Sequence, residues 1–166
     1  MSDGPDDILT PDEASFRTVL GHFATGVTVI TAMDGDEPVG MAANSFTSVS
    51  LDPPLVLFCA AKSSSTWPRI QAAKQFTVNI LSEHQEHLSR AFATKGADRF
   101  REIGWRPGVG GAPVLGDVLA YIDCQIEAEH EAGDHVVVIG RVLDLGVAAD
   151  AGPLLFHKGG YGRLLT

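Results

Sequence analysis

The chain has 166 residues, with 12 Lys and Arg against 21 Asp and Glu, which gives a formal net charge of −9. This length suits one domain with a continuous core, and the negative charge argues against nucleic acid and anionic membranes as partners. The sequence has no run of about eighteen apolar residues and no signal peptide. It therefore predicts a cytoplasmic protein with a disordered leader over residues 1–9 and one domain over residues 10–166.

The first predicted element is a helix. Thr10 can cap it, Pro11 suits its first position and Glu13 completes a capping box. Gly26 is the predicted end of this helix. Apolar residues recur between these ends at the spacing of one helix face, at Phe16, Val19, Leu20 and Phe23.

Four β-branched or apolar runs follow. They predict strands over residues 27–32, 39–50, 55–61 and 75–81. Turn-forming residues separate the first three strands. A short helix that ends at Ala73 is predicted after residues 63–66, and Ser82 with Gln85 predicts a capping box for a helix through about Phe92.

The second half of the chain begins with an excursion over residues 95–117, which is rich in Gly and Pro. Residues 120–132 and 135–147 predict two long strands, which Gly133-Asp134 joins as a hairpin. A last short strand and a glycine-rich bend follow. Six or seven strands that do not alternate with helices predict a mainly β fold, a Greek-key barrel with a few short helices. Cys59 and Cys124 lie in apolar runs and are predicted to be buried thiols.

Familiar catalytic motifs do not occur in the sequence. The glycines of residues 108–111 and 159–162 lack the flanking strand and helix of a dinucleotide fingerprint, and no phosphate loop or GxSxG elbow is found. His84 and His87 share a helix face, but no third ligand is spaced nearby. A solvated helix face is therefore preferred to a metal site.

Three stretches carry possible binding chemistry. Residues 62–66, Lys-Ser-Ser-Ser-Thr, place hydroxyls and an ammonium group at a predicted helix start, which suits a phosphate; the alternative is a plain serine cap. The small side chains of residues 40–50 would let a planar ligand lie against the backbone, or would simply pack a tight strand. His135 follows Gly133-Asp134 and either reaches a cleft or lies on the surface of a hairpin turn.

Taken together, these stretches resemble the flavin-reductase-like family, which includes the reductase components of two-component flavin monooxygenases. The resemblance runs from about Phe16 to Leu164. It rests on five motifs in the family's order: FATGVTV (23–29), AANSFTSVSLDPP (42–54), KSSST (62–66), GDH (133–135) and HKGGY (157–161). The resemblance implies an FMN-binding split β-barrel that is usually a homodimer.

The same resemblance implies an NAD(P)H:flavin oxidoreductase that reduces FMN or FAD with NADH or NADPH and passes reduced flavin to a partner monooxygenase. His135 is expected on the nicotinamide side, as the catalytic candidate. Tyr161 is expected as a wall of the flavin pocket. The remaining cofactor-binding candidates are Met41, Ala42, Ala43, Asn44, Ser45, Ser48, Val49 and Ser50 for the ring and ribityl chain, and Lys62, Ser63, Ser65 and Thr66 for the phosphate, with Ala60 just before them.

Hydride transfer between nicotinamide and flavin needs geometry more than a general acid or base, because the flavin carries the chemistry. Two alternatives stay open at this point. One is a non-enzymatic FMN carrier or electron-transfer protein of the same fold, against which the Gly133–His135 motif argues. The other is a structural barrel without a ligand.

Overall fold

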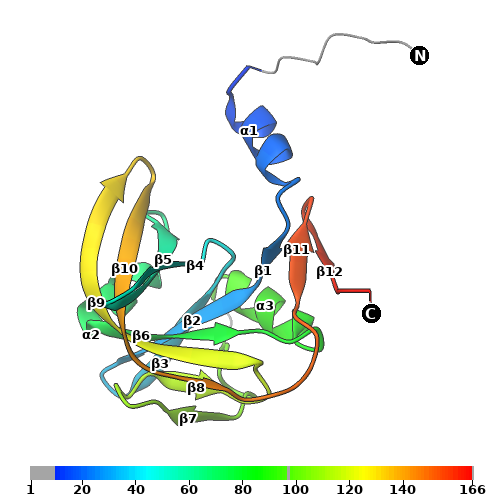
Figure 1. Cartoon of the computed structure of the whole chain (residues 1–166). Helices are drawn as coiled ribbons and strands as arrows, with labels where there is room; N and C mark the ends of the chain where they lie inside the picture. Colours follow the sequence, from blue (N-terminus) through cyan, green and yellow to red (C-terminus); the bar gives the residue numbers. More distant parts are fainter. Residues whose placement is uncertain (1–9, 97, 166) are drawn as a thin grey trace.

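The computed structural model describes residues 10–96 and 98–165, so the predicted disordered leader lies outside the described residues. Within this range the chain forms one large sheet, two small sheets and three short helices (Figure 1). None of the helices in these residues is long and apolar enough to cross a membrane. The helices are α1 (Glu13–Leu20), α2 (Trp67–Ala73) and α3 (Glu86–Ala93).

The large sheet has seven antiparallel strands in the order β3-β2-β6-β9-β10-β5-β4. Its two edge strands, β3 and β4, follow one another in the chain, and β3 also contacts β5, so the sheet curls toward closure. The predicted mainly β, split-barrel fold is confirmed. The strands are β2 (Thr28–Asp34), β3 (Glu37–Ala43), β4 (Thr47–Leu51), β5 (Pro54–Ala61), β6 (Gln75–Ile80), β9 (Ala120–Ala132) and β10 (His135–Val147).

Two small sheets flank the large one. The predicted excursion contains a short hairpin of β7 (Trp105–Pro107) and β8 (Pro113–Leu115). Near the ends of the described chain, β1 (Thr25–Gly26) pairs with β11 (Leu155–His157), which pairs in turn with β12 (Gly160–Gly162). The predicted hairpin of residues 120–132 and 135–147 is present with Gly133-Asp134 as its turn.

The predicted strand over residues 39–50 is broken into β3 and β4. The break falls at residues 44–46, where the Ser45 hydroxyl accepts a hydrogen bond from the Cys59 N–H at 2.9 Å and lies 3.2 Å from its carbonyl oxygen. These bonds let the chain leave β3 and return beside β5. A side-chain bond that replaces strand pairing leaves no trace in the pattern of apolar residues.

The predicted ends of the first helix are wrong. Asp12, not Thr10, caps α1, because its carboxylate accepts a hydrogen bond from the Ser15 N–H at 2.8 Å. The helix ends at Leu20 with Gly21 as its cap, and Gly26 lies in β1. The helix stands away from the large sheet (Figure 1), and none of its residues is buried.

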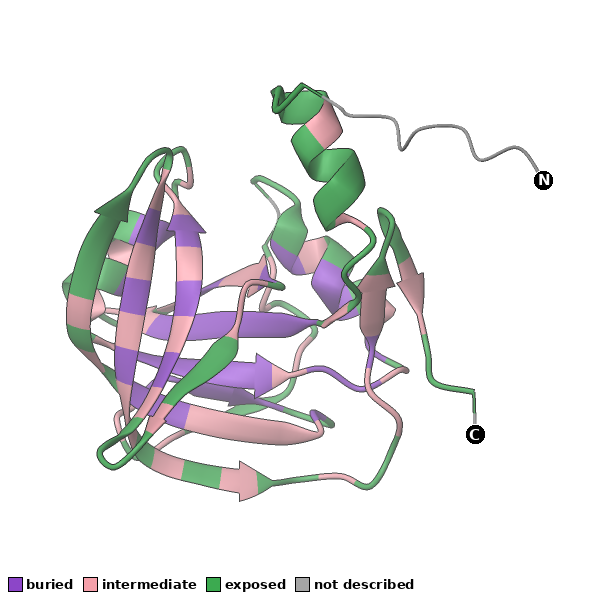
Figure 2. Cartoon of the chain, turned by 45° about the horizontal axis from the view of Figure 1, so that its top comes forward, coloured by how far each residue is buried: buried purple, intermediate pink, exposed green. Residues whose placement is uncertain are grey.

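Two apolar clusters form the core, and both lie against the central strands (Figure 2). One includes Phe58, Phe76 and Ile70 between the sheet and α2, and the other includes Phe92 and Leu88 of α3. Of the two predicted buried thiols, Cys124 is buried, and burial raises its pKa to about 12, whereas Cys59 is half-buried.

A buried polar network ties the excursion to the sheet. Asp123 is fully buried and accepts hydrogen bonds from the Thr77 hydroxyl at 3.1 Å and from the Gly110 N–H at 2.8 Å. The Asn79 side chain donates to the Thr31 hydroxyl at 3.0 Å and accepts from the Leu115 N–H at 2.9 Å. Each of these polar groups is thus satisfied by a segment far away in the sequence.

Candidate functional site

The edge strand β3 carries one cavity near its C-terminal end, which we name the Tyr161 cavity. It has a volume of about 200 Å³ and lies between β3, α3 and the β11–β12 hairpin. Three predicted small or polar residues, Ala42, Ala43 and Asn44, line it together with the predicted wall residue Tyr161. Its other lining residues are Val27, Ser89, Ala93 and Phe156.

Tyr161 is held from three directions. Its hydroxyl lies 2.8 Å from the Ser89 hydroxyl, and the Arg90 guanidinium lies 4.9 Å from the centre of its ring. The Phe156 ring meets it edge-on at 5.3 Å. Sequence reasoning missed Ser89 and Phe156, because only the packing of α3 against the last hairpin brings them to this wall.

A second cavity lies beside the N-terminal half of β3, and we name it the Arg99 cavity. It has a volume of about 600 Å³. Of the predicted phosphate residues, it contains Ser65 and Thr66. Its other lining residues are Glu37, Pro38, Val39, Gly40, Arg69, Gly96, Asp98, Arg99 and Phe100.

The two cavities follow one another along β3. Residues 37–40 line the Arg99 cavity, and residues 42–44 line the Tyr161 cavity. A strand rises about 3.3 Å per residue, so the midpoints of these two sets of residues are separated by about 15 Å along the strand. A flavin mononucleotide has a comparable extent, with a planar ring at one end and a phosphate at the other.

One feature of the residues present fits such a group. The Thr25 hydroxyl oxygen is buried without a hydrogen-bond partner among the described residues, and Thr25 pairs with Phe156 of the Tyr161 cavity. Separately from any ligand, Gly40 lets β3 pack closely on α3, because a Cβ atom there would lie 2.8 Å from the Phe92 ring. The site thus combines a narrow apolar end with a polar end.

The predicted phosphate loop lies against the turn of the β9–β10 hairpin. The Lys62 N–H donates to the Asp134 carbonyl at 2.9 Å, and the Lys62 ammonium group pairs with Glu131. The structure therefore brings together the 62–66 and 133–135 stretches, which the sequence separates widely. In the same region the ammonium group of Lys62, which was predicted to bind a phosphate, is already paired with the Glu131 carboxylate.

The remaining predicted flavin residues are spread over several environments. Asn44 is exposed, and Ser45 bonds to the backbone of Cys59. Ala60 is 0% exposed in the core, so only its backbone is available to a ligand. Ser48, Val49 and Ser50 lie on edge strand β4, Met41 packs against the core, and Ser63 lies exposed beside Lys62.

His135 is half-buried at the tip of the β9–β10 hairpin. Its Nδ1 lies 2.7 Å from the Asp134 carboxylate, and this hydrogen bond, together with the charge of the imidazole, lowers the pKa of Asp134. The tip of the β9–β10 hairpin and the β11–β12 hairpin lie on opposite sides of the molecule (Figure 1), and His135 is not among the residues that line the Tyr161 cavity. Within one chain, His135 is therefore not brought to the Tyr161 cavity.

We expect the substitution His135→Ala to raise the KM for the nicotinamide or to lower the rate of hydride transfer, and to leave flavin affinity near its wild-type value. The reason is that an imidazole oriented by Asp134 can donate a hydrogen bond to a carboxamide or meet a phosphate. Steady-state kinetics with varied nicotinamide and a separate flavin titration measure the two effects. Wild-type nicotinamide kinetics, or a loss of flavin instead, would show that His135 has another role.

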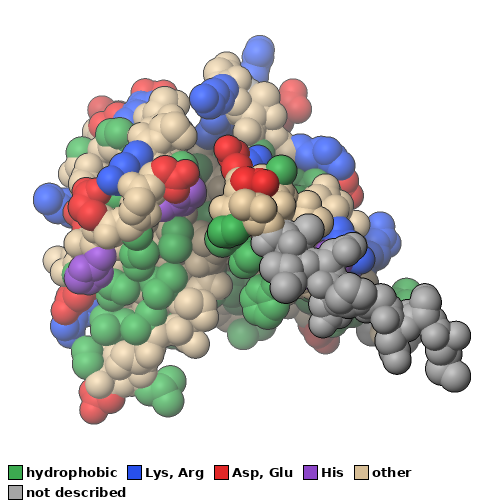
Figure 3. Space-filling view, turned by 90° about the horizontal axis from the view of Figure 1, so that it is seen from above, with side chains coloured by type: hydrophobic (Ala, Val, Ile, Leu, Met, Phe, Trp, Pro, Cys, Tyr) green, Lys and Arg blue, Asp and Glu red, His purple; other side chains and the backbone are tan. Residues whose placement is uncertain are grey.

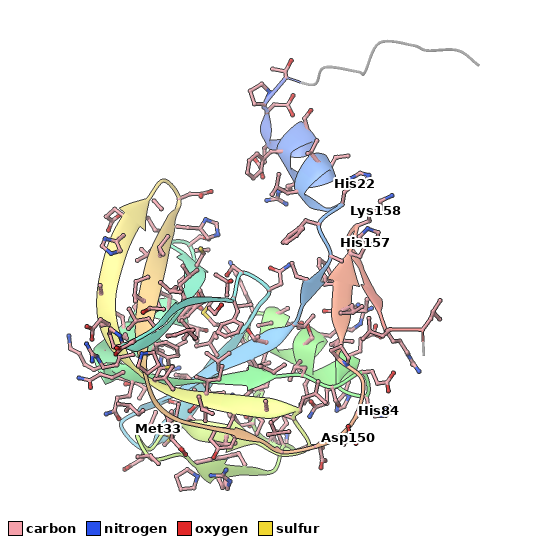
Figure 4. All side chains as sticks on the ribbon, viewed as in Figure 1. His22, Met33, His84, Asp150, His157 and Lys158 are labelled. Atoms are coloured by element: carbon pink, nitrogen blue, oxygen red, sulfur yellow. The ribbon has the colours of Figure 1, made fainter. Side chains whose placement is uncertain are left out.

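The other histidines are dispersed. His22, His157 and Lys158 lie together where α1 meets the β11–β12 hairpin, far from His84 and Asp150 (Figure 4). His84 and His87 line a third cavity, of about 830 Å³, on the side of α3 next to residues 98–104. Among the described residues this cavity carries charges of both signs, including those of Arg101 and Glu102.

Comparison with known proteins places these features in a family. The family model described as "Flavin reductase like domain" matches residues 20–165. The reductase subunit HsaB of a flavin-dependent monooxygenase from Mycobacterium tuberculosis is 48% identical over 152 residues, which are 90% of this chain and 81% of that protein. The FMN reductase (NADH) SmoA of Agrobacterium fabrum is 46% identical over 149 residues, which are 90% and 84% of the two chains.

Solved structures agree with the sequence matches. The NADH:FAD oxidoreductase SgcE6 of Streptomyces globisporus, solved in complex with NAD and FAD fragments, superposes with a TM-score of 0.90 at 39% identity. That match covers 96% of this chain and 97% of the other.

Proposed function

Because this chain belongs to the flavin reductase like domain family, we propose that it is an NAD(P)H:flavin oxidoreductase that reduces FMN or FAD by hydride transfer. The observation that carries the proposal is the pair of cavities along β3, one small and walled by Tyr161, the other lined by hydroxyls and arginine. A non-enzymatic flavin carrier would use the same two cavities. The relatives SmoA and SgcE6 are named as reductases, which favours the reductase over the carrier.

In this proposal the chain's own residues bind the flavin and orient its ring. The small residues 42–44 bring the backbone of β3 to the ring, and Tyr161, fixed by Ser89 and Arg90, walls the ring on the other side. Ser65 and Thr66 take the polar end of the flavin. The bound flavin supplies the hydride-accepting chemistry. Holding two planar rings in contact lowers the entropic part of the barrier, so no general acid or base is required.

The hydride donor and the flavin acceptor are proposed by analogy with the named relatives. SmoA is named an NADH-dependent FMN reductase and SgcE6 an NADH:FAD oxidoreductase, so we assign NADH as the donor to be tested first and leave FMN and FAD as competing acceptors. HsaB is named as the reductase subunit of a monooxygenase. By analogy, reduced flavin from this chain passes to a partner flavin-dependent monooxygenase, in a cytoplasm where Cys59 and Cys124 stay reduced.

The test is anaerobic mixing of the purified chain with NADH or NADPH and with FMN or FAD in all four pairings. The oxidised flavin absorbance band is expected to fall at a rate proportional to protein concentration, far above that of the same mixture without protein. Stable flavin binding without nicotinamide oxidation would identify a carrier instead. If no pairing is turned over and no flavin binds, the proposal fails.

We further propose that the chain forms a homodimer. The apolar stripe of α1 is uncovered, with Phe16 60% and the following Phe23 76% exposed. Hydrophobic side chains also gather on the lobe formed by β5 and the β9–β10 hairpin, seen from above in Figure 3. The half-exposed apolar residues on the outer face of these strands are Leu55, Leu57, Cys59, Val137 and Ile139. An eight-residue helix is not stable without a packing partner, and a second copy of the chain supplies one.

We expect the substitution Ile139→Glu to convert this dimer into a monomer. Ile139 pairs with Leu57 and Ala128 in the middle of the outer face, so a carboxylate there has to be desolvated when the face is covered. Light scattering at micromolar concentration measures the mass, and Lys74→Glu on the exposed end of α2 is the control. A monomeric wild type, or a variant that stays dimeric, contradicts this use of the face.

A further inference from the structure

The backbone of the β11–β12 hairpin gives the Tyr161 side chain little support of its own. Tyr161 is the middle residue of β12, with Gly160 before it and Gly162 after it, and β12 is an edge strand that pairs only with β11. A glycine neighbour has no side chain that could pack beside the phenol. The position of the Tyr161 hydroxyl is therefore set by the group that it meets on α3.

That group is the hydroxyl of Ser89, which has no other partner. Ser89 is 3% exposed, and its oxygen lies 2.8 Å from the phenolic oxygen of Tyr161. A serine inside a helix can bond to the carbonyl four residues earlier, but among the described residues the Ser89 hydroxyl forms no such bond. A buried hydroxyl without a partner is costly, so its hydrogen points to the phenolic oxygen. Ser89 thus donates, and Tyr161 accepts.

The phenol of Tyr161 keeps its own hydrogen in this arrangement. One bond between two hydroxyl groups uses only one of their two hydrogens. Within residues 10–96 and 98–165, the phenolic oxygen has no second side-chain or backbone partner. Tyr161 is half-buried and lines the Tyr161 cavity together with Ser89. The phenol is therefore a hydrogen-bond donor that is available to a molecule in the cavity.

Tyr121 shows the opposite arrangement. The Arg106 guanidinium lies 4.9 Å from the centre of its ring, which is also the distance between Arg90 and the Tyr161 ring. The Tyr121 hydroxyl, however, donates to the Asp144 carboxylate at 3.2 Å. An ionised carboxylate only accepts hydrogen bonds, so this bond uses the single hydrogen of the phenol. Tyr121 also lines none of the three cavities described above, which makes it a matched control.

We propose that the Tyr161 hydroxyl donates a hydrogen bond to an acceptor atom of the flavin ring, and that Ser89 is the positioning residue that orients it. This inference rests on the proposed function, because it assumes that the ring occupies the Tyr161 cavity. In the proposed reaction a hydride, one hydrogen with two electrons, leaves the nicotinamide and bonds to the flavin ring, which gains negative charge while the nicotinamide is oxidised. A donor fixed in place beforehand stabilises such developing charge more than it stabilises the oxidised ring.

The test is the rate of hydride transfer in a single anaerobic turnover, with the fastest pairing of flavin and nicotinamide, both saturating. Tyr161→Phe and Ser89→Ala are each expected to lower this rate by roughly 3- to 10-fold, the range of one net hydrogen bond. The double variant is expected to match Tyr161→Phe, because Ser89 acts only through Tyr161. Tyr121→Phe, the matched control, is expected to transfer hydride at the wild-type rate.

Thermal melts of the same variants separate this role from a structural one. A lower melting temperature in Ser89→Ala together with a wild-type rate would show that Ser89 only supports the hairpin, and the proposal would be wrong. A double variant that is slower than Tyr161→Phe would mean that the two hydroxyls act independently, which also contradicts it. An equal loss of rate in Tyr121→Phe would overturn the assignment of the donor to Tyr161.

Flavin fluorescence distinguishes failure of this inference from failure of the proposed function. A tyrosine next to a flavin ring quenches its fluorescence, so Tyr161→Phe is expected to brighten the bound flavin. Brighter flavin with a wild-type rate keeps the ring in the cavity and overturns the donor role. Unchanged fluorescence with wild-type turnover overturns the placement of the ring and leaves the reductase standing. Absence of turnover by the wild type with every pairing overturns the proposed function itself.

Discussion

The substitution Ala93→Trp is expected to lower kcat/KM for the flavin by about 100-fold or more while the fold remains intact. Ala93 is exposed on α3 and lines the Tyr161 cavity, whose volume is about 200 Å³. An indole at this position competes with the flavin ring for the same space. Because the side chain points out of the core, the change does not overpack the interior.

The measurement is steady-state oxidation of the nicotinamide with varied flavin, accompanied by a thermal melt. Ala72→Trp is the matched control, since Ala72 is an exposed alanine on α2 that lines none of the three cavities described above. The control is expected to keep wild-type kinetics. Unchanged flavin kinetics in Ala93→Trp would mean that the ring does not lie in the Tyr161 cavity.

The substitution Asp123→Ala is expected to destabilise the fold by about 2–5 kcal/mol, because the Thr77 hydroxyl and the Gly110 N–H would each lose a buried partner. At about 3 kcal/mol, the midpoint of thermal unfolding falls by roughly 6–12 °C for a chain of this size. Urea unfolding followed by fluorescence measures the free energy of unfolding directly. Glycine is required at position 108 beside this carboxylate, because a Cβ atom there would lie 2.6 Å from one of the Asp123 oxygens.

Asp144→Ala provides the comparison. Asp144 accepts a hydrogen bond from the Tyr121 hydroxyl at 3.2 Å, but it is only half-buried, so its loss is expected to cost under about 1 kcal/mol. Equal destabilisation by the two substitutions would show that the buried network around Asp123 is not a principal source of stability.

Much of the fold could be predicted from the sequence, because its signals are local. Apolar runs gave the places of β2, β5 and β6, and Gly133-Asp134 gave the turn of the long hairpin. The side chain of Gln85 accepts a hydrogen bond from the Ser82 N–H at 3.0 Å, which is half of the predicted capping box, although α3 begins at Glu86. The break between β3 and β4 and the cap of α1 were harder to predict, because several nearby Asp, Ser and Thr side chains could each bond to the same backbone groups.

The candidate site could be predicted only at residues that belong to short sequence motifs. Residues 42–44, Ser65, Thr66 and Tyr161 were expected, and the structure distributes them over two neighbouring cavities. Arg99, Ser89 and Ala93 were missed, since they reach the groove from α3 and the segment after it. Their spacing in the sequence does not indicate which strand α3 packs against. That packing is set by tertiary contacts, which a single sequence does not show.

The last hairpin of the described chain has a consequence for biosynthesis. Phe156 and Tyr161 close the cavity whose floor, at residues 42–44, is translated much earlier. A nascent chain can pair β2 with β3 and β4 with β5 while it is still being extended, but it has no complete ring site until β11 and β12 leave the ribosome. If the flavin ring binds there as proposed, its stabilising effect by mass action begins only after β11 and β12 have been synthesised. Limited proteolysis that removes β11 and β12 should accordingly abolish the flavin-dependent rise in melting temperature.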